Sequence, residues 1–253
     1  MPTTNHDNIK RTVRETYGKI ASAEMSGCGC SCSPSWGYSQ VERDSVPRGA
    51  DLGLGSGNPQ AMANIQPGET VIDLGSGGGI DCFLAAEAVG DDGLVIGIDM
   101  TPEMVSRARA NAEEGGYSSV DFRLGEIENL PVADNSVDVI MSNCVINLSP
   151  DKASVYGEAF RVLKPGGRMA ISDVVTTIEL PDEVRGDLEQ YAACISGAAS
   201  IPELEDILTK AGFENVRIQP SSGAGEIPDT WNPGSDISDY TVSATIEAVK
   251  PVE

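Results

Sequence analysis

The feature that most constrains the fold is a glycine-rich turn between an apolar segment and a helical one. Residues 70–74 (Thr-Val-Ile-Asp-Leu) have the pattern of a buried strand, residues 75–79 (Gly-Ser-Gly-Gly-Gly) that of a tight turn, and residues 80–89 that of a helix. Glycine lets a backbone approach a ligand closely, and the N–H groups at the start of a helix can point at it. A strand that enters a helix through such a turn is typical of proteins with a mostly parallel sheet.

The same alternation continues to the end of the chain. Further strands are predicted at 94–99, 120–124, 137–142, 168–174, 213–219 and 240–248, and helices at 102–114, 151–163, 182–192 and 202–211. Thr101 is expected to cap the helix that Pro102 begins. The last two strands have no helix between them, which indicates a hairpin and hence one antiparallel edge strand. We therefore predict an α/β, Rossmann-like fold with a seven-stranded, mostly parallel sheet and helices on both faces.

The first part of the chain has a different composition. Residues 7–24 have helical spacing of apolar side chains, and residues 25–60 are rich in Gly, Ser, Cys and Pro, which predicts an irregular segment. We expect residues 1–60 to form an N-terminal helix and a cysteine-containing loop. Residues 61–253 would form the main domain, with an insertion near 180–212 on the acceptor side.

Charge and composition exclude several kinds of partner. The net charge is −22 with 17 basic residues, and no basic stripe is visible, so nucleic acid and anionic membrane surfaces are disfavoured. No apolar run approaches the roughly 18 residues of a membrane span, and the N-terminus lacks a signal pattern. Six cysteines in a chain of this length do not indicate a disulfide scaffold. We expect a monomer in the cytoplasm, where clustered cysteines point to metal, metalloid or redox chemistry.

The glycine-rich turn has the spacing Gly-x-Gly-x-Gly rather than that of a dinucleotide site. Asp73 can reach the cationic end of a ligand, and Asp99, which ends the next strand, can bind both hydroxyls of a ribose. These features resemble the class I S-adenosylmethionine-dependent methyltransferases. The resemblance implies that S-adenosylmethionine is the cofactor and that it is held by Asp73, Gly75, Ser76, Gly77, Gly79, Asp99, Met100, Glu126, Ile127 and Asn143.

The cysteines point to the acceptor. Cys144 lies two positions after the end of the strand at 137–142, at the end of the sheet where ligands bind in such folds. Cys194 follows a predicted helix in the insertion, and Cys28, Cys30 and Cys32 are close together in the irregular segment. Thiols bind soft ions, but a buried thiol is equally well a small apolar core residue. Spacing alone leaves both interpretations open for Cys144 and Cys194.

From Gly49 onward the chain resembles the arsenite methyltransferases. The matching stretches are residues 50–59, 99–104, 123–128, 142–147 (Ser-Asn-Cys-Val-Ile-Asn), 172–175, 231–234 and 244–248. The resemblance implies that arsenite, or its thiol conjugate, is held by cysteine thiolates and methylated from S-adenosylmethionine. It marks Cys144 and Cys194 as the arsenic ligands and the catalytic pair.

One position departs from that pattern. Family members commonly have cysteine where this chain has Ser56, and a serine hydroxyl is a hard, protonated oxygen that cannot replace a thiolate on a soft ion. One of Cys28, Cys30 and Cys32 could serve instead as the third ligand or as an electron donor, with Cys32 the leading catalytic candidate. Alternatively, two protein thiolates and one exogenous thiol hold the arsenic.

The expected reaction needs no general base, because arsenic bound to sulfur keeps a lone pair that can attack the methyl group. The single histidine, His6, lies near the N-terminus, where a mobile segment is expected. A cellular dithiol, thioredoxin-like or small, would regenerate trivalent arsenic. Two other functions stay open: a methyltransferase for a small organic acceptor, which would leave Cys144 and Cys194 without a task, and a thiol protein that binds metalloids without catalysis.

Overall fold

The computed structural model describes residues 6–22, 37–178, 180, 188–192, 194–221 and 240–252. Cys28, Cys30, Cys32 and the stretch at 231–234 lie outside the described residues. No helix in the described part of the chain is long and apolar enough to cross a membrane.

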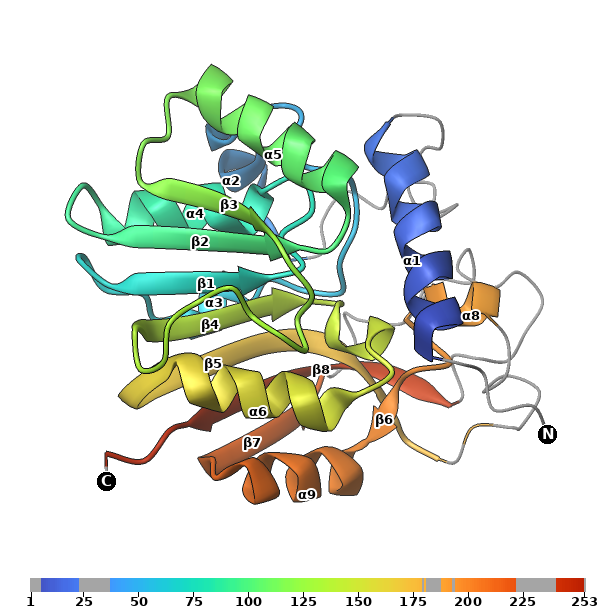
Figure 1. Ribbon diagram of the computed structural model, residues 1–253. Helices are drawn as coiled ribbons and strands as arrows, with labels where there is room; N and C mark the ends of the chain where they lie inside the picture. Colours follow the sequence, from blue (N-terminus) through green and yellow to red (C-terminus); the bar gives the residue numbers. More distant parts are fainter. Residues whose placement is uncertain are drawn as a thin grey trace.

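A single sheet organises the described residues (Figure 1). Its strands lie in the order β3-β2-β1-β4-β5-β8-β7, and β6 pairs with β5 beside this path. Neighbours from β3 through β5 are parallel. The bounds are β1 Thr70–Leu74, β2 Leu94–Asp99, β3 Val120–Leu124, β4 Val137–Asn143, β5 Leu163–Thr176, β6 Ala199–Ser200, β7 Glu214–Pro220 and β8 Thr241–Val249.

The predicted Rossmann-like α/β fold is confirmed, with two differences in the sheet. The described part of the sheet has eight strands rather than seven, because the short β6 pairs with the end of β5. The antiparallel strand is β8, and it does not lie at the edge. It pairs with β5 on one side and β7 on the other, so the edge strand β7 is parallel to β5. Of the two hairpin strands, β8 takes the inner position next to β5 because it is longer and more apolar than β7 and has more side chains to bury. Most residues of β7, at the edge, are exposed.

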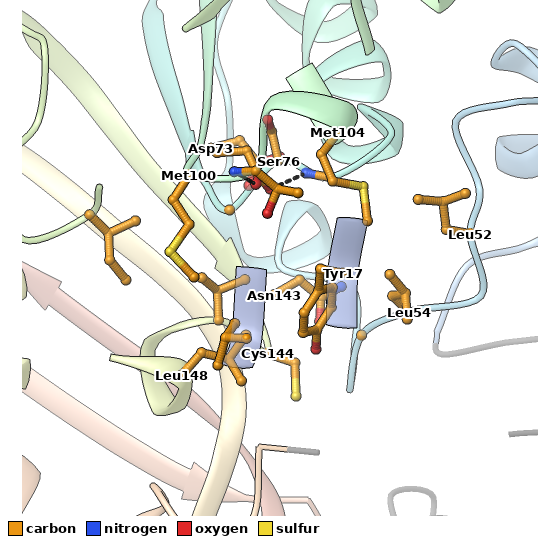
Figure 2. Close-up of a pocket in the computed structure, with 18 of the residues that line it drawn as sticks. Tyr17, Leu52, Leu54, Asp73, Ser76, Met100, Met104, Asn143, Cys144 and Leu148 are labelled. Carbon is orange, nitrogen blue, oxygen red and sulfur yellow. Dashed lines mark hydrogen bonds between the residues drawn. The ribbon is translucent and has the colours of Figure 1, made fainter. Parts of the chain in front are cut away.

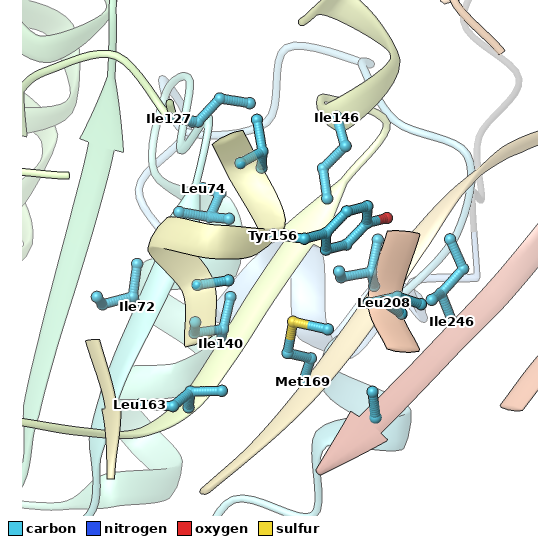
Figure 3. Close-up of a cluster of buried hydrophobic side chains, with 14 of the residues drawn as sticks. Ile72, Leu74, Ile127, Ile140, Ile146, Tyr156, Leu163, Met169, Leu208 and Ile246 are labelled. Atoms are coloured by element: carbon cyan, nitrogen blue, oxygen red, sulfur yellow. The ribbon is translucent and has the colours of Figure 1, made fainter. Parts of the chain in front are cut away.

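Helices cover both faces, as predicted. The bounds are α4 Ile80–Val89, α5 Pro102–Gly115, α6 Lys152–Val162, α8 Leu188–Ala192 and α9 Ile201–Ala211. On one face α6 and α9 pack against the strands in a core that includes Ile140, Tyr156 and Leu208 (Figure 3). On the other face α4 and α5 bury Phe83, Val105 and their neighbours. Burial of two such layers holds the carboxyl ends of the parallel strands in fixed register.

The N-terminal part contains more helix than its composition predicts. Besides α1 (His6–Ala21), the segment expected to be irregular holds α2 (Gln40–Ser45) and reaches the start of α3 (Gln60–Ala63). The signal for α2 is a capping box, in which Ser39 and Glu42 satisfy each other's backbone N–H groups. His6 is the first residue of α1 and its side chain is exposed.

One capping prediction was also wrong in detail. Thr101 occupies the N-cap position of α5, but its side chain makes no cap hydrogen bond. The backbone N–H of Thr101 instead donates to Asp99 Oδ1 over 2.8 Å. The carboxylate that ends β2 therefore holds the start of α5, and this ties the helix to the candidate ligand site.

Candidate active site: a cofactor cavity that ends at two thiols

A cavity opens at the carboxyl ends of β1, β2 and β4, where the strand arrows in Figure 1 point toward α1. The glycine-rich turn, Asp99 and Met100 line it, together with Asn143, Cys144 and Cys194. In the view of Figure 2, Cys144 and Leu148 are drawn next to each other. Tyr17 lies between these two residues on one side and Leu52 and Leu54 on the other. The cavity therefore joins the predicted cofactor residues to both predicted arsenic ligands.

The glycine-rich turn is held by backbone and carboxylate hydrogen bonds. Gly75 and Ser76 donate their N–H groups to the carbonyl oxygen of Ile98 over 2.7 and 3.0 Å. Gly77 donates to Asp99 Oδ2 over 3.0 Å, and its φ of 51° suits a residue without Cβ. Asp99 is half-buried, and its desolvation raises the pKa of its carboxyl. Each Asp99 oxygen keeps a second lone pair, so the carboxylate can still accept from a ligand's hydroxyl groups.

The other predicted cofactor residues divide into two groups. Met100, Ile127 and Asn143 line the cavity, as do Asp73, Gly75, Ser76 and Gly77. Glu126 and Gly79 are not among the lining residues. Gly79 is the N-cap of α4, and a Cβ there would collide with the rings of Phe83 and Phe122, so it serves packing in this structure.

Glu126 points to α1. Its carboxylate accepts from Lys10 over 2.8 Å and from Arg14 over 3.2 Å, and these bonds lower its pKa. Its neighbour Glu128 lines the cavity and lies 3.2 Å from Lys10. The partners of Glu126 in this structure are therefore the cations of α1.

The two thiols meet at the far end of the cavity. Cys194 Sγ donates to the carbonyl oxygen of Cys144 over 3.0 Å, and the side chains share an apolar cluster with Val13, Leu148 and Tyr191. The relative exposure is 5% for Cys144 and 2% for Cys194. The neighbouring Cys194 side chain, followed by burial, raises the pKa of the Cys144 thiol. A metalloid that displaces the thiol protons would therefore have two sulfur ligands at one point.

The backbone at both cysteines is unusual. In the described chain the non-glycine residues with left-handed φ are three asparagines, which tolerate it, and Cys144 (57°) and Cys194 (64°). Such a conformation costs about 1 to 3 kcal/mol and persists only when the surroundings impose it. Its presence at both thiols favours a functional role over simple core packing.

Neighbouring residues explain how the two cysteine segments are held. Asn147 donates its amide to Asp173 over 2.9 Å and to the carbonyl of Val174 over 2.6 Å. Gly197 passes so close to the Asn147 carbonyl that a Cβ at position 197 would collide with it. The segment after Cys144 and the segment after Cys194 are therefore locked against each other by contacts that only glycine permits.

Ser56 also lies at this end of the site. Its side chain is buried, its hydroxyl is 3.4 Å from that of Ser172, and its proximity to the Cys144 thiol opposes the rise in the pKa of that thiol. The residue that departs from the family pattern thus contacts a candidate arsenic ligand. Among the described residues no group of three or more His, Cys, Asp and Glu side chains forms a metal site, so only the pair of thiols is present.

Several lining residues escaped the sequence analysis. Lys10, Val13 and Tyr17 come from α1, and Asp81 lies in the first turn of α4. The helical spacing of Val13 and Tyr17 indicated an apolar face but not what it covers. The signal for Asp81 was a carboxylate in an otherwise apolar helix, which is costly to bury without a purpose.

Comparison with known proteins agrees with this geometry. Residues 65–212 match a family model described as a methyltransferase domain. An arsenite methyltransferase from Halobacterium salinarum is 49% identical over 97% of this chain and 67% of its own length. The chain belongs to the arsenite methyltransferase family. The human arsenite methyltransferase is 37% identical over 81% of this chain, which spans 58% of that protein.

Solved structures of relatives give the same result for the fold. An arsenic(III) S-adenosylmethionine methyltransferase from Chlamydomonas reinhardtii superposes with a TM-score of 0.64 at 32% identity, over 85% of this chain and 71% of its own. A phosphoethanolamine N-methyltransferase from Haemonchus contortus has a TM-score of 0.69 at 15% identity, over 98% of this chain and 61% of its own, and shares the fold alone.

S-adenosylmethionine is the cofactor of this methyltransferase. The residues around the cavity fit it: a glycine turn open to a ligand, the Asp99 carboxylate at a strand end, and the buried Asp73 for a positive charge. Membership of this family also disfavours a protein that binds metalloids without catalysis.

Proposed function

We propose that this chain methylates trivalent arsenic, presented as arsenite or its thiol conjugate, with S-adenosylmethionine as methyl donor. The observation that carries the proposal is the meeting of Cys144 and Cys194 at the wall of the cofactor cavity. The halobacterial and human relatives are named for the same reaction. An organic acceptor would give this pair of strained, buried thiols no task.

Cys144 and Cys194 bind the arsenic as thiolates: each As–S bond forms as one As–O bond of arsenite, or one As–S bond of its conjugate, breaks, and the thiol proton leaves with the displaced ligand as water or free thiol. Arsenic held by sulfur keeps a lone pair. S-adenosylmethionine supplies an electrophilic methyl group on a sulfonium sulfur. With the cofactor in the cavity, the lone pair would attack the methyl carbon, so that the As–C bond forms as the S–C bond breaks and neutral S-adenosylhomocysteine is released. No proton is removed from the nucleophile, which agrees with His6 lying outside the cavity lining.

The protein's contribution is position. Fixing both partners can supply about 7 to 11 kcal/mol of the barrier in favourable cases. The interlocked backbones after Cys144 and Cys194 and the buried glycine turn are rigid supports for that purpose.

Methylation oxidises arsenic formally from trivalent to pentavalent. A cellular dithiol, small or thioredoxin-like, would return two electrons and close a disulfide. The third arsenic ligand is either one of Cys28, Cys30 and Cys32 or an exogenous thiol, because Ser56 provides only a hydroxyl next to Cys144. We propose that Cys32 or its neighbours act in the ligand or electron-donor role.

The experiment is product speciation from purified protein, arsenite, a dithiol and isotope-labelled S-adenosylmethionine. Labelled methylarsenicals are expected in a yield that depends on the dithiol. Binding of cofactor without any methylarsenical product would contradict the proposal. Transfer of label to an organic acceptor under the same conditions would favour the alternative function.

A further inference from the structure

Two buried carboxylates form one wall of the cofactor cavity. Asp73 and Asp81 both line it, with relative exposures of 2% and 5%. Asp73 is the penultimate residue of β1, and Asp81 lies in the first turn of α4. The two acids therefore flank the glycine turn. The lining contains one cation from the described chain, Lys10, and its ammonium is already paired with Glu126 and Glu128.

Asp81 is held in place by a chain of hydrogen bonds. Tyr38, itself buried, donates its hydroxyl to Asp81 Oδ1 over 2.7 Å. Asn143 donates to the Tyr38 oxygen over 2.9 Å and to the Gly57 carbonyl over 2.7 Å, and its own oxygen accepts from Ser56 N–H over 2.9 Å. The carboxylate is thus aimed by partners that are neutral, and none of them compensates its charge.

Burying a carboxylate among neutral groups and beside another acid is costly unless a cation joins it. The methyltransferase cofactor carries such a cation, the α-ammonium of its methionyl end. A recess with an acid on each side of the glycine turn is complementary in charge to that ammonium group. The side-chain amide of Asn143 donates to the Tyr38 hydroxyl and in this way supports the recess.

We propose that Asp81 binds the α-ammonium of S-adenosylmethionine together with Asp73, and that Tyr38 is the positioning residue that aims the Asp81 carboxylate. Tyr38 comes from the segment before α2, which the sequence placed outside the cofactor domain. That segment is therefore part of the cofactor site. The inference rests on the cofactor and not on the identity of the acceptor.

Two probes separate the ammonium from the rest of the ligand. S-adenosylhomocysteine has the adenosine, the thioether and the amino-acid end, whereas 5′-methylthioadenosine lacks the amino-acid end. Calorimetry should show that Asp81→Asn weakens S-adenosylhomocysteine about 10- to 100-fold, the range of a hydrogen bond to a charged group, and leaves 5′-methylthioadenosine within about threefold. Asp99→Asn is the matched control, since it should weaken both probes alike through the shared ribose.

Tyr38→Phe provides a second, independent variant. It removes the donor to Asp81 and should also weaken S-adenosylhomocysteine selectively, by about 3- to 30-fold, without affecting 5′-methylthioadenosine. Retained binding of 5′-methylthioadenosine shows that each variant is folded. If Asp81→Asn weakens both probes equally, or neither, the proposal is wrong. No arsenical is present, so the result is independent of the proposed acceptor.

Discussion

Cys194 Sγ donates a hydrogen bond to the carbonyl oxygen of Cys144 over 3.0 Å, although the two residues are 50 positions apart in the chain. The contact brings a residue from the end of β4 together with one from the segment after α8. Both backbones have left-handed φ, so each thiol is turned to this meeting point by its own main chain.

Removing either thiol should abolish arsenic methylation and spare cofactor binding. We expect Cys144→Ser and Cys194→Ser to lower methylarsenical formation at least about 100-fold, because a hydroxyl stays protonated and binds a soft ion poorly. Affinity for S-adenosylhomocysteine should change by less than about threefold. Product chromatography and calorimetry measure the two quantities.

Cys82→Ser is the control for this pair. Cys82 is the third described cysteine, fully buried on α4, and its thiol donates to Asp73 over 3.4 Å, a bond that serine can also make. This variant should keep its arsenic activity. Parent-level activity in Cys144→Ser would remove Cys144 from the mechanism.

A thiol at position 56 should strengthen arsenic binding. Ser56 lies next to the Cys144 side chain, so Ser56→Cys would add a third sulfur beside the first two. We expect arsenite affinity, followed by thiol-dependent fluorescence or calorimetry, to increase at least about tenfold. Ser45→Cys, which adds an exposed thiol on α2, should leave it unchanged. An equal gain in both variants, or in neither, would mean that position 56 is not a ligand position.

The ion pair between Glu126 and Lys10 of α1 predicts that substitutions of these two residues affect cofactor affinity non-additively. If Glu126 supports the cofactor only through Lys10 and α1, then Glu126→Gln, Lys10→Met and the double variant should each weaken S-adenosylhomocysteine by a similar, small factor of about 2 to 5. Glu126 is 41% exposed, and screening by salt keeps the effect small. Additive losses, with more than about tenfold from Glu126→Gln alone, would instead show direct contact with the cofactor.

Asp81 should make the stability of the cofactor-free protein depend on pH. Burial is the main cause that raises the pKa of Asp81 to about 6; the negative charge of Glu42 adds to the rise, and the hydrogen bond from Tyr38 opposes it. The folded protein then holds this proton more tightly than the unfolded chain, whose aspartate titrates near about 4. The free energy of unfolding therefore decreases as the pH rises from about 4 to about 6, and the loss is complete above that.

Asp81→Asn removes this titration. In urea unfolding without ligand, the variant should lose less stability than the parent between about pH 4 and pH 6, and be more stable at pH 7 by about 1 to 3 kcal/mol. Asp173, whose pKa burial also raises to about 6, stays in both proteins and cancels in the comparison. Parallel curves for parent and variant would contradict the assignment.

The sequence predicted the fold well where pattern and period are local. The bounds of β1, α4, β2 and β3 match the expected ranges, since each depends on apolar spacing and on glycine or proline at its ends. The strands of the final hairpin were also found, but their order in the sheet was not. The spacing of apolar residues predicts which side chains of a strand are buried. Which strand pairs with β5 depends instead on how much surface each strand can bury against it.

The candidate site was predicted in the same uneven way. The cofactor turn, Asp99 and the candidates Cys144 and Cys194 could be predicted from the sequence, because a glycine turn after a strand and cysteines in a family-specific stretch are local signals. Only the tertiary structure decided that the two thiols meet, that Ser56 touches one of them, that Glu126 faces α1, and that Tyr38 and Asp81 complete the cavity. These are contacts between segments far apart in the chain, and their geometry is set by the packing of helices on the sheet, which no single stretch of sequence contains.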